Sequence, residues 1–197
     1  IQNLLGKVDR LLIGGAMAYT FFKARGIAVG RSLVEDDKLD AARAIETAAA
    51  ARGVQLLLPV DHVVTERLEA GAPSEVLAVG DARIGDRMGV DIGPATIAAY
   101  QAMLADAKTV VWNGPMGVFE MAAFAAGTKA VATAMTEVDG MTVVGGGDSA
   151  AAVRVLGIGE AGFTHISTGG GACIEFLTGK KLPALDALER SRALFGI

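Results

Sequence analysis

The sequence has a single cysteine, Cys173, and only two histidines among its 197 residues. One cysteine excludes an intrachain disulfide and any metal site built from several cysteines. Cys173 follows a run of glycines at a predicted helix start, where the pKa of a thiol can be lowered, but no histidine or asparagine partner stands near it. We therefore expect an unreactive, packed thiol in a reducing, cytoplasmic setting.

Long apolar runs and clusters of basic residues are also missing. No run approaches the roughly 18 residues that a transmembrane helix needs. The first twelve residues are interrupted by Lys7, Asp9 and Arg10, which does not fit a secretory signal. With a formal net charge of −4 and no basic cluster, the chain is not expected to bind nucleic acid. Any phosphate site must therefore depend on backbone dipoles, a metal ion and a few cations.

The composition that remains is typical of a globular protein. Hydrophobic residues make up 52% and charged residues 20%, which excludes a disordered chain. A chain of this length suits one domain with a sizeable core.

Four times along the chain a short apolar stretch runs into glycines and then into a helical pattern. These units read LLIGGAMA, VVWNGPMG, VVGGGDSA and THISTGGGA. Alternating strands and helices predict an α/β fold with a doubly wound, mostly parallel, Rossmann-like sheet and helices on both faces. In such sheets ligands bind beyond the carboxyl ends of the strands. All four glycine turns are therefore predicted to lie along one edge of the sheet.

The hydrophobic pattern also predicts where the elements lie. Helices are expected over residues 16–26, 39–52, 95–107, 119–138 (with a break near Gly127), 150–156 and 172–177. Strands are expected over 11–13, 55–59, 109–112, 141–144 and 163–166. Residues 1–10 are expected to be the tail of a helix, 60–65 to be extended, and 68–87 to be irregular around one short β-like stretch. An irregular region of that length in a compact domain indicates function.

The stretch Met141–Ala150 carries the strongest chemical signal. Its strand residues run into three glycines, and their amide N–H groups, with those of the following helix start, form a natural seat for phosphate. Asp148 beside that seat suits a divalent cation, although a simple helix cap is the alternative. Glu120, just past the second glycine turn, is either a solvated acid at a helix start or an acceptor for ribose hydroxyls.

Other motifs for nucleotide binding or hydrolysis are absent or misplaced. The chain has no GxxxxGK[ST] loop and no HExxH pair, so His62 and His165 are expected to be surface or hydrogen-bonded side chains. Ser149 and Ser167 lack the GxSxG elbow of a serine hydrolase. Residues 157–162 match GxGxxG literally, but they leave a helix and enter a strand, which is the reverse of the dinucleotide-binding context.

Taken together, several motifs resemble the phosphoglycerate kinase family, in its C-terminal, nucleotide-binding half. The resemblance runs from about Ile1 to Pro183 and rests on LLIGGAMAYTFFKA, LLLPVDHVV, MGVDIGP, KTVVWNGPMGVFE, VVGGGDSAAAV and HISTGGGACIEFLTGKKLP. It implies that residues 1–197 form the nucleotide-binding domain of a two-domain glycolytic kinase. Such a kinase transfers the acyl phosphate of 1,3-bisphosphoglycerate to MgADP, giving ATP and 3-phosphoglycerate.

The same resemblance implies a role for each residue that matches the family's motifs. The adenine side of the pocket would be lined by Gly14, Gly15, Ala16, Leu68, Met88, Gly89 and Val90. The rest of the nucleotide would be bordered by Asn113, Pro115, Gly117 and Val118, with Glu120 on the ribose. Gly146 and Gly147 would approach the phosphates, Asp148 would hold Mg²⁺, and Ser149 would supply a hydroxyl. The catalytic glycines Gly169, Gly170 and Gly171 would face the phosphoryl group in transfer.

Two parts of the family pattern are not found in this sequence. One is the basic pocket for the triose phosphate, which the family carries in its N-terminal half. The other is a GGAKVxDK segment with phosphate-binding lysines, which by the resemblance would end just upstream of Ile1. We therefore expect a monomer that binds ADP or ATP with Mg²⁺, needs the N-terminal domain with its 3-phosphoglycerate site, and turns over little or nothing alone. Two alternatives stay open: a non-catalytic nucleotide-binding module, and a Rossmann-type dinucleotide or sugar-nucleotide enzyme.

Overall fold

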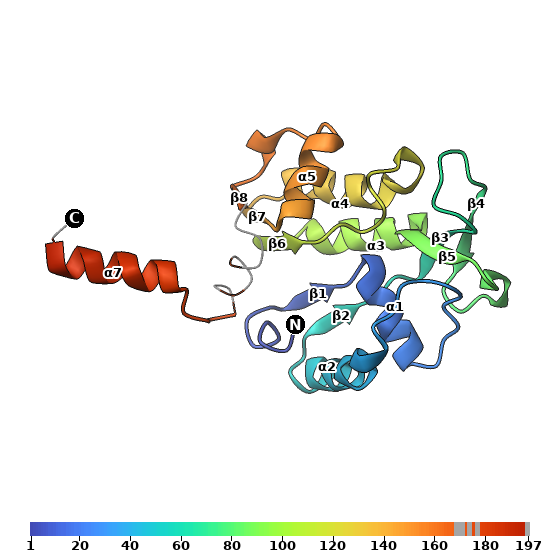
Figure 1. Cartoon of the computed structure of the whole chain (residues 1–197), viewed down its shortest axis with the longest axis horizontal. Helices are drawn as coiled ribbons and strands as arrows, with labels where there is room; N and C mark the ends of the chain where they lie inside the picture. The colour runs from blue at the N-terminus through green and yellow to red at the C-terminus, as the bar shows by residue number, and fades with distance from the viewer. Residues whose placement is uncertain (168–171, 173–174, 176–177, 196–197) are drawn as a thin grey trace.

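The computed structural model describes residues 1–167, 172, 175 and 178–195 (Figure 1). In chain order the helices and strands are β1 (Arg10–Leu12), α1 (Gly15–Ala24), α2 (Leu39–Ala51), β2 (Gln55–Leu57), β3 (Asp61–Thr65), β4 (Ser74–Ala78), β5 (Met88–Ile92), α3 (Pro94–Leu104), β6 (Thr109–Asn113), α4 (Ala126–Thr136), β7 (Met141–Gly145), α5 (Gly147–Val155), β8 (His165–Ser167) and α7 (Pro183–Phe195). Short 3₁₀ helices lie at Asp36–Lys38, Ala82–Ile84, Ala122–Phe124 and Glu160–Gly162.

Two of the sheets are parallel. Strands β1 and β2 pair in one of them. Strands β6, β7 and β8 lie side by side in the other, with Asn113, Gly145 and Ser167 in register at their carboxyl ends. Helix α4 connects β6 to β7, and α5 connects β7 to β8, as parallel neighbours require. This arrangement confirms the predicted α/β class with mostly parallel strands.

A third sheet is antiparallel and was not predicted. It has the order β4-β3-β5, with β3 paired to both neighbours and a register shift between Val63 and Val64. The extended segment expected at 60–65 and the short β-like stretch expected within 68–87 are confirmed as β3 and β4, with β4 at the edge of this sheet. The pattern missed β5 and the antiparallel pairing, because strands of five residues give a weak signal and this pairing joins segments separated by long turns.

Two predicted helices are wrong or misplaced. Residues 1–9 form turns rather than a helix tail, closed by the Leu4 N–H, which donates to the Ile1 carbonyl oxygen at 2.8 Å. Helix α4 begins at Ala126 and not at Phe119, because residues 119–125 form a turn and a 3₁₀ helix that bury Phe119 and Phe124. Gly127 lies inside the first turn of α4, so it does not break the helix.

Two apolar clusters make the core. One lies among α3, α4, α5 and the strands β6 and β7, and includes Tyr100, Trp112 and Val144; the other lies among β1, β2, α1 and α2. The Tyr100 hydroxyl joins them, because it donates to the Ile13 carbonyl oxygen at 2.6 Å. Helix α7 lies apart from both clusters (left in Figure 1), with Leu188 65% exposed. None of the helices in the described part of the chain is long and apolar enough to cross a lipid bilayer.

Candidate functional site

The turns that follow β1, β6 and β7 are bonded to one another at the carboxyl ends of the strands. The Gly15 N–H, at the start of α1, donates to the Met116 carbonyl oxygen at 3.1 Å. The Gly114 N–H donates to Ser149 Oγ at 2.7 Å, across to the start of α5. We call these three turns, residues 13–17, 113–118 and 145–149, the glycine rim. Three of the four glycine turns predicted to share one edge are therefore brought together.

The fourth turn belongs to the end of β8, which is parallel to β7 and in register with it at Ser167. Strand β8 therefore ends at the same edge as the glycine rim. The predicted catalytic residues Gly169, Gly170 and Gly171 and the thiol of Cys173 lie outside the described residues.

Close packing explains most of the rim glycines without any ligand. A Cβ on Gly14 would lie 2.3 Å from Met116 Sδ, and one on Gly15 would lie 2.8 Å from the Pro115 carbonyl oxygen. Gly146 has a φ of +90°, and a Cβ there would lie 2.7 Å from Asn113 Oδ1. Gly114 and Gly147 are different, since no described atom lies within 4 Å of either ideal Cβ position. The φ of +99° at Gly114 itself favours glycine. Gly147, the first residue of α5, therefore marks open space at the rim among the described residues.

Helix α5 begins at this open space with free backbone donors. Its N-cap is Gly146, and no side chain caps it. The first N–H groups of a helix have no partner within the helix, and its dipole favours an anion there. Asp148 lies in this first turn, is exposed, and has no hydrogen bond or ion pair with any described residue. The capping role considered for Asp148 is thus not observed.

The donor set at α5 suits Mg²⁺ shared with a phosphate. Mg²⁺ is commonly held by one or two carboxylates together with the phosphates of a substrate and water. Within the described residues, no three or more histidines, cysteines, aspartates or glutamates gather in a cluster that could hold a metal ion alone. Asp148 therefore fits a cation that arrives with its ligand, and does not fit a permanent protein-held metal.

Ser149 and Asn113 lie at the rim but differ in accessibility. Ser149 is fully buried, and its hydroxyl accepts the Gly114 N–H, so it connects two turns. Asn113 ends β6 and is exposed. Glu120 is also exposed, and its carboxylate has no hydrogen bond or ion pair with any described residue.

A buried carboxylate that the sequence analysis missed supports the middle turn of the rim. Asp91 on β5 is 3% exposed, and its Oδ2 accepts the Gly127 N–H at 2.7 Å at the start of α4. A Cβ on Gly117 would lie 2.3 Å from Asp91 Oδ1, so the rim turn rests directly on this carboxylate. Burial raises the pKa of Asp91 to about 6, although the Gly127 and Ile92 N–H groups favour its ionised form. In the sequence, the one sign of this role is that Asp91 is an acidic residue between the apolar residues Val90 and Ile92.

Thr128 completes the support of this turn from helix α4. It is fully buried, and its Oγ accepts the Met116 N–H at 3.0 Å and the Gly117 N–H at 3.2 Å. The Val118 N–H in turn donates to the Val90 carbonyl oxygen at 2.8 Å. The predicted residues Gly117, Val118 and Val90 are thus one bonded unit, in which the Val90 side chain is buried and its backbone is used.

The residues predicted for the adenine side lie on exposed and half-buried segments near β5. Leu68 is 52% exposed, Ala16 is exposed, and Met88 and Gly89 are half-buried. Ser32 Oγ accepts the Gly89 N–H at 2.9 Å, which places the neighbouring Leu33, 73% exposed, as a further candidate. Leu33 was missed because nothing in its local pattern separates it from an ordinary loop residue.

The two histidines have no part in the rim. His62 is buried on β3, and its Nδ1 shares a hydrogen bond of 2.9 Å with the Tyr19 hydroxyl, while Nε2 has no partner. Burial lowers the pKa of His62, so it is neutral near pH 7. His165 is exposed on β8. These placements agree with the prediction of surface or hydrogen-bonded histidines.

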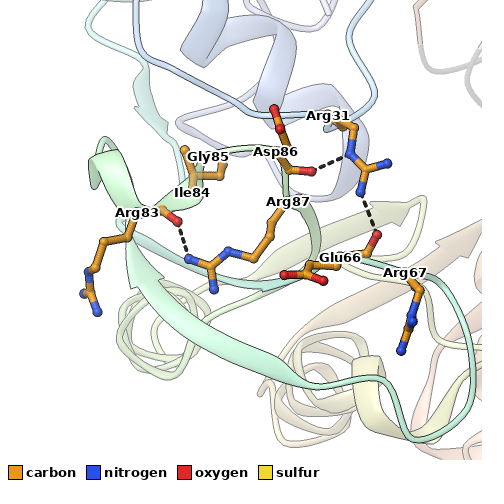
Figure 2. A pocket seen from close by; sticks show the side chains of 8 residues that line it. All are labelled: Arg31, Glu66, Arg67, Arg83, Ile84, Gly85, Asp86 and Arg87. Atoms are coloured by element: carbon orange, nitrogen blue, oxygen red, sulfur yellow. Dashed lines mark hydrogen bonds between the residues drawn. The ribbon is translucent and has the colours of Figure 1, made fainter.

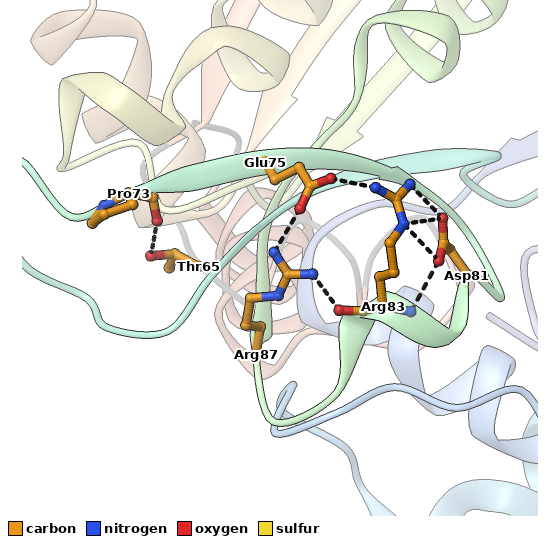
Figure 3. A network of polar contacts seen from close by, with 6 residues as sticks. All are labelled: Thr65, Pro73, Glu75, Asp81, Arg83 and Arg87. Atoms are coloured by element: carbon orange, nitrogen blue, oxygen red, sulfur yellow. Dashed lines mark hydrogen bonds and ion pairs between the residues drawn. The ribbon is translucent and has the colours of Figure 1, made fainter.

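A hollow of about 720 Å³ lies beside the antiparallel sheet (Figure 2). It is lined by Arg31, Glu66, Arg67, Arg83, Ile84, Gly85, Asp86 and Arg87. Below it, Glu75 bridges two of these arginines, with Oε1 accepting from Arg83 at 2.7 Å and Oε2 from Arg87 at 2.8 Å (Figure 3). Arg83 also pairs with Asp81 at 2.7 Å. The hollow therefore carries both signs of charge.

Comparison with protein families and known proteins gives one consistent result. The family model described as "Phosphoglycerate kinase" matches residues 1–180. Curated proteins named phosphoglycerate kinase from Clostridium novyi and Moorella thermoacetica are each 58% identical to the chain, over 190 and 189 residues. These alignments cover 96% and 95% of the chain but 47% of each relative. The chain thus spans about half the length of the curated relatives that it matches.

Solved structures agree with the sequence relatives. The phosphoglycerate kinase structure from Coxiella burnetii superposes with a TM-score of 0.89 at 44% identity, over 94% of this chain and 47% of that one. The structure from Pyrococcus horikoshii gives a TM-score of 0.77 at 32% identity, over 98% of this chain and 49% of that one. In sequence and in fold, the chain therefore matches about half of each of these longer relatives.

Proposed function

Because the chain belongs to the phosphoglycerate kinase family, we propose that it is the C-terminal, nucleotide-binding half of such an enzyme and binds MgADP or MgATP along the glycine rim. The observation that carries this proposal is the junction of three strand-to-helix turns at one edge, with the free carboxylate of Asp148 beside the open start of α5. Backbone donors and a helix N-terminus suit a polyphosphate.

Each part of the rim has a proposed task in binding. Gly146 and Gly147 let the polyphosphate approach the amides of α5, and Asp148 holds the Mg²⁺ that accompanies it. This Mg²⁺ would offset negative charge on the phosphate oxygens. Glu120 accepts hydrogen bonds from the ribose, and Asn113, Pro115, Gly117 and Val118 border the nucleotide. The adenine lies against Gly14, Gly15, Ala16, Leu68, Met88, Gly89 and Val90.

The reaction proposed for the whole enzyme is phosphoryl transfer between 1,3-bisphosphoglycerate and ADP in glycolysis. Such a transfer needs alignment of its reactants and compensation of charge on the transferred group. The glycine rim contains no lysine or arginine, so the rim itself would compensate charge through backbone donors and the cation. We assign Gly169, Gly170 and Gly171 to the phosphoryl group, and the cations and the 3-phosphoglycerate site to an N-terminal domain. The enzyme would act as a cytoplasmic monomer.

The proposal separates from its alternatives by two measurements on this chain. Calorimetry should detect heat with MgADP and none with NAD, whereas a Rossmann-type dinucleotide enzyme predicts the opposite. A mixture of this chain with a separately produced N-terminal half of a family member should form ATP from 1,3-bisphosphoglycerate and ADP, while this chain alone should form little. A non-catalytic nucleotide-binding module would bind MgADP and stay inactive in the mixture.

A further inference from the structure

Arg31 joins three segments that lie far apart in the sequence (Figure 2). Its Nη2 donates to the Glu66 carbonyl oxygen at 2.7 Å, and its Nε donates to the Asp86 carbonyl oxygen. Its backbone N–H donates to the Arg87 carbonyl oxygen at 2.9 Å. One residue therefore fixes the loop after β3 and the loop before β5 to the segment that follows α1.

The residues on either side of Arg31 strengthen this junction. Gly30 has a φ of +57°, and a Cβ there would lie 2.1 Å from the Arg87 carbonyl oxygen, so the turn packs directly on the loop before β5. Ser32 Oγ accepts the Gly89 N–H at 2.9 Å. The segment 30–32 is thus bonded at several points along residues 85–89, and Arg31 alone extends the junction to Glu66.

The three joined segments each present an apolar side chain next to the junction. Leu33 and Leu68 are 73% and 52% exposed, and Met88 is half-buried. These apolar side chains offer surface against which a flat base could pack. The spacing of these side chains depends on how the loops are held, because loops lack the internal backbone pairing of helices and strands.

Arg31 differs from the other arginines of the hollow in what it binds. Arg83 and Arg87 pair with the carboxylates of Glu75 and Asp81 (Figure 3), and Arg67 pairs with Glu69. Among the described residues, the Arg31 guanidinium donates to backbone carbonyl oxygens and to no carboxylate. A planar guanidinium that donates to two carbonyl groups fixes the position of the main chain itself.

We propose that Arg31 is a positioning residue of the nucleotide site, which fixes the loops that border the base and so sets affinity for the nucleoside part of the ligand. It acts on Leu33, Leu68 and Met88 through the backbone and does not touch the polyphosphate. The proposal rests on the proposed function, because it assumes that these loops border the base. It assigns to Arg31 a role that no pattern in the sequence indicates.

The test compares two ligands and two arginines of the same hollow. Calorimetry on the whole chain would measure MgADP and Mg-pyrophosphate with the wild type, Arg31→Ala and the matched control Arg83→Ala. Arg31→Ala should weaken MgADP about five- to tenfold and leave Mg-pyrophosphate within about twofold, since hydrogen bonds of this kind are modest individually. Arg83→Ala should leave both affinities within about twofold, because its exposed ion pairs do not reach residues 30–32 or 66.

The outcomes separate the inference from the proposed function. If the wild type binds MgADP and Arg31→Ala binds it equally well, the inference is overturned and the proposed function stands. The same holds if Arg31→Ala loses affinity for MgADP and Mg-pyrophosphate equally, because an equal loss indicates general damage to the fold. No wild-type binding of MgADP overturns the proposed function together with the inference. If Arg31→Ala fails to fold by circular dichroism, Arg31→Lys replaces it, because one ammonium cannot reproduce the two-carbonyl fork. An intermediate, MgADP-selective loss in Arg31→Lys supports the inference, and wild-type affinity overturns it.

Discussion

The glycine rim and the hollow beside the antiparallel sheet are stabilised by different kinds of interaction. The middle turn of the rim rests on buried side chains that accept backbone N–H groups: Asp91, Thr128 and Ser149, each at most 3% exposed. The hollow is held by arginines near the surface, and the Arg83 side chain is 64% exposed. Buried acceptors fix backbone amides that would otherwise be unpaired, whereas exposed ion pairs contribute little to stability. The middle turn of the rim should therefore be rigid and sensitive to mutation, whereas the ion pairs of Glu75 and Asp81 with Arg83 and Arg87 should tolerate substitution.

The largest expected difference concerns the charge of Asp91. Its pKa is raised from 3.8 to about 6 in the folded chain, so between these pH values the folded state holds a proton that the unfolded state has lost. The contribution of Asp91 to stability is therefore fully present below about pH 4, and about 3 kcal/mol of it is lost as the pH rises through 6. Asp91→Asn should abolish this fall, as measured by urea unfolding between pH 4 and 8. Curves of unfolding free energy against pH that run parallel for the two proteins would contradict the assignment. Because both proteins contain His62 and the other titrating groups, subtracting one curve from the other isolates the contribution of Asp91.

The next largest effect on stability is expected at Thr128, which accepts hydrogen bonds from two backbone N–H groups. Thr128→Val keeps the shape but leaves the buried Met116 and Gly117 N–H groups without an acceptor, at a cost of about 2 kcal/mol in the free energy of unfolding. Thr128→Ser keeps the hydroxyl and should recover most of this loss. Chemical unfolding of both variants checks the prediction. Equal stability of the valine variant and the wild type would show that the turn has other anchors.

Ser149 should show a smaller effect of the same kind. Ser149→Ala removes one acceptor, that of the Gly114 N–H, and should cost about 1 kcal/mol. Since the hydroxyl is used within the protein, MgADP affinity should change less than stability does. A tenfold loss of affinity with unchanged stability would instead indicate that the hydroxyl contacts the ligand, as the family resemblance implied.

The smallest effect is expected for the ion pairs of the hollow. Arg83→Ala should leave the unfolding midpoint within experimental error of the wild type, at low salt and in 1 M NaCl alike, because its partners Glu75 and Asp81 remain solvated. A clear destabilisation that disappears in high salt would show that the network has a structural role and would weaken the contrast with the rim.

Local sequence signals predicted the parts of the molecule that depend on neighbours in the chain. The helix starting at Pro94, the strand at Met141 and the glycine turns all follow from short patterns, and their order was enough to predict the α/β class and one shared edge. The bounds of α4 were wrong because Phe119 and Phe124 are buried by tertiary packing, and helical periodicity cannot distinguish that from a helix.

The anchors of the site could not be predicted because they act across long stretches of sequence. Asp91 meets Gly127 and Gly117, and Arg31 meets Glu66 and Asp86, with separations of 26 to 55 residues. No spacing rule connects such positions. An acid inside an apolar strand indicates a buried partner without saying which residue it is. An exposed arginine in a loop carries no signal at all.

The affinity of the chain for MgADP, compared between the wild type and Asp148→Asn, tests the central claim most directly. The rim amides and one carboxylate are proposed to bind the polyphosphate with its cation, so the substitution should weaken MgADP by about tenfold or more, while unfolding stability stays unchanged because Asp148 is exposed and unpaired. Removal of Mg²⁺ with EDTA should weaken ADP binding to the wild type and have little further effect on the variant. Equal affinities for the two proteins, or no binding of MgADP to the wild type, would contradict the account.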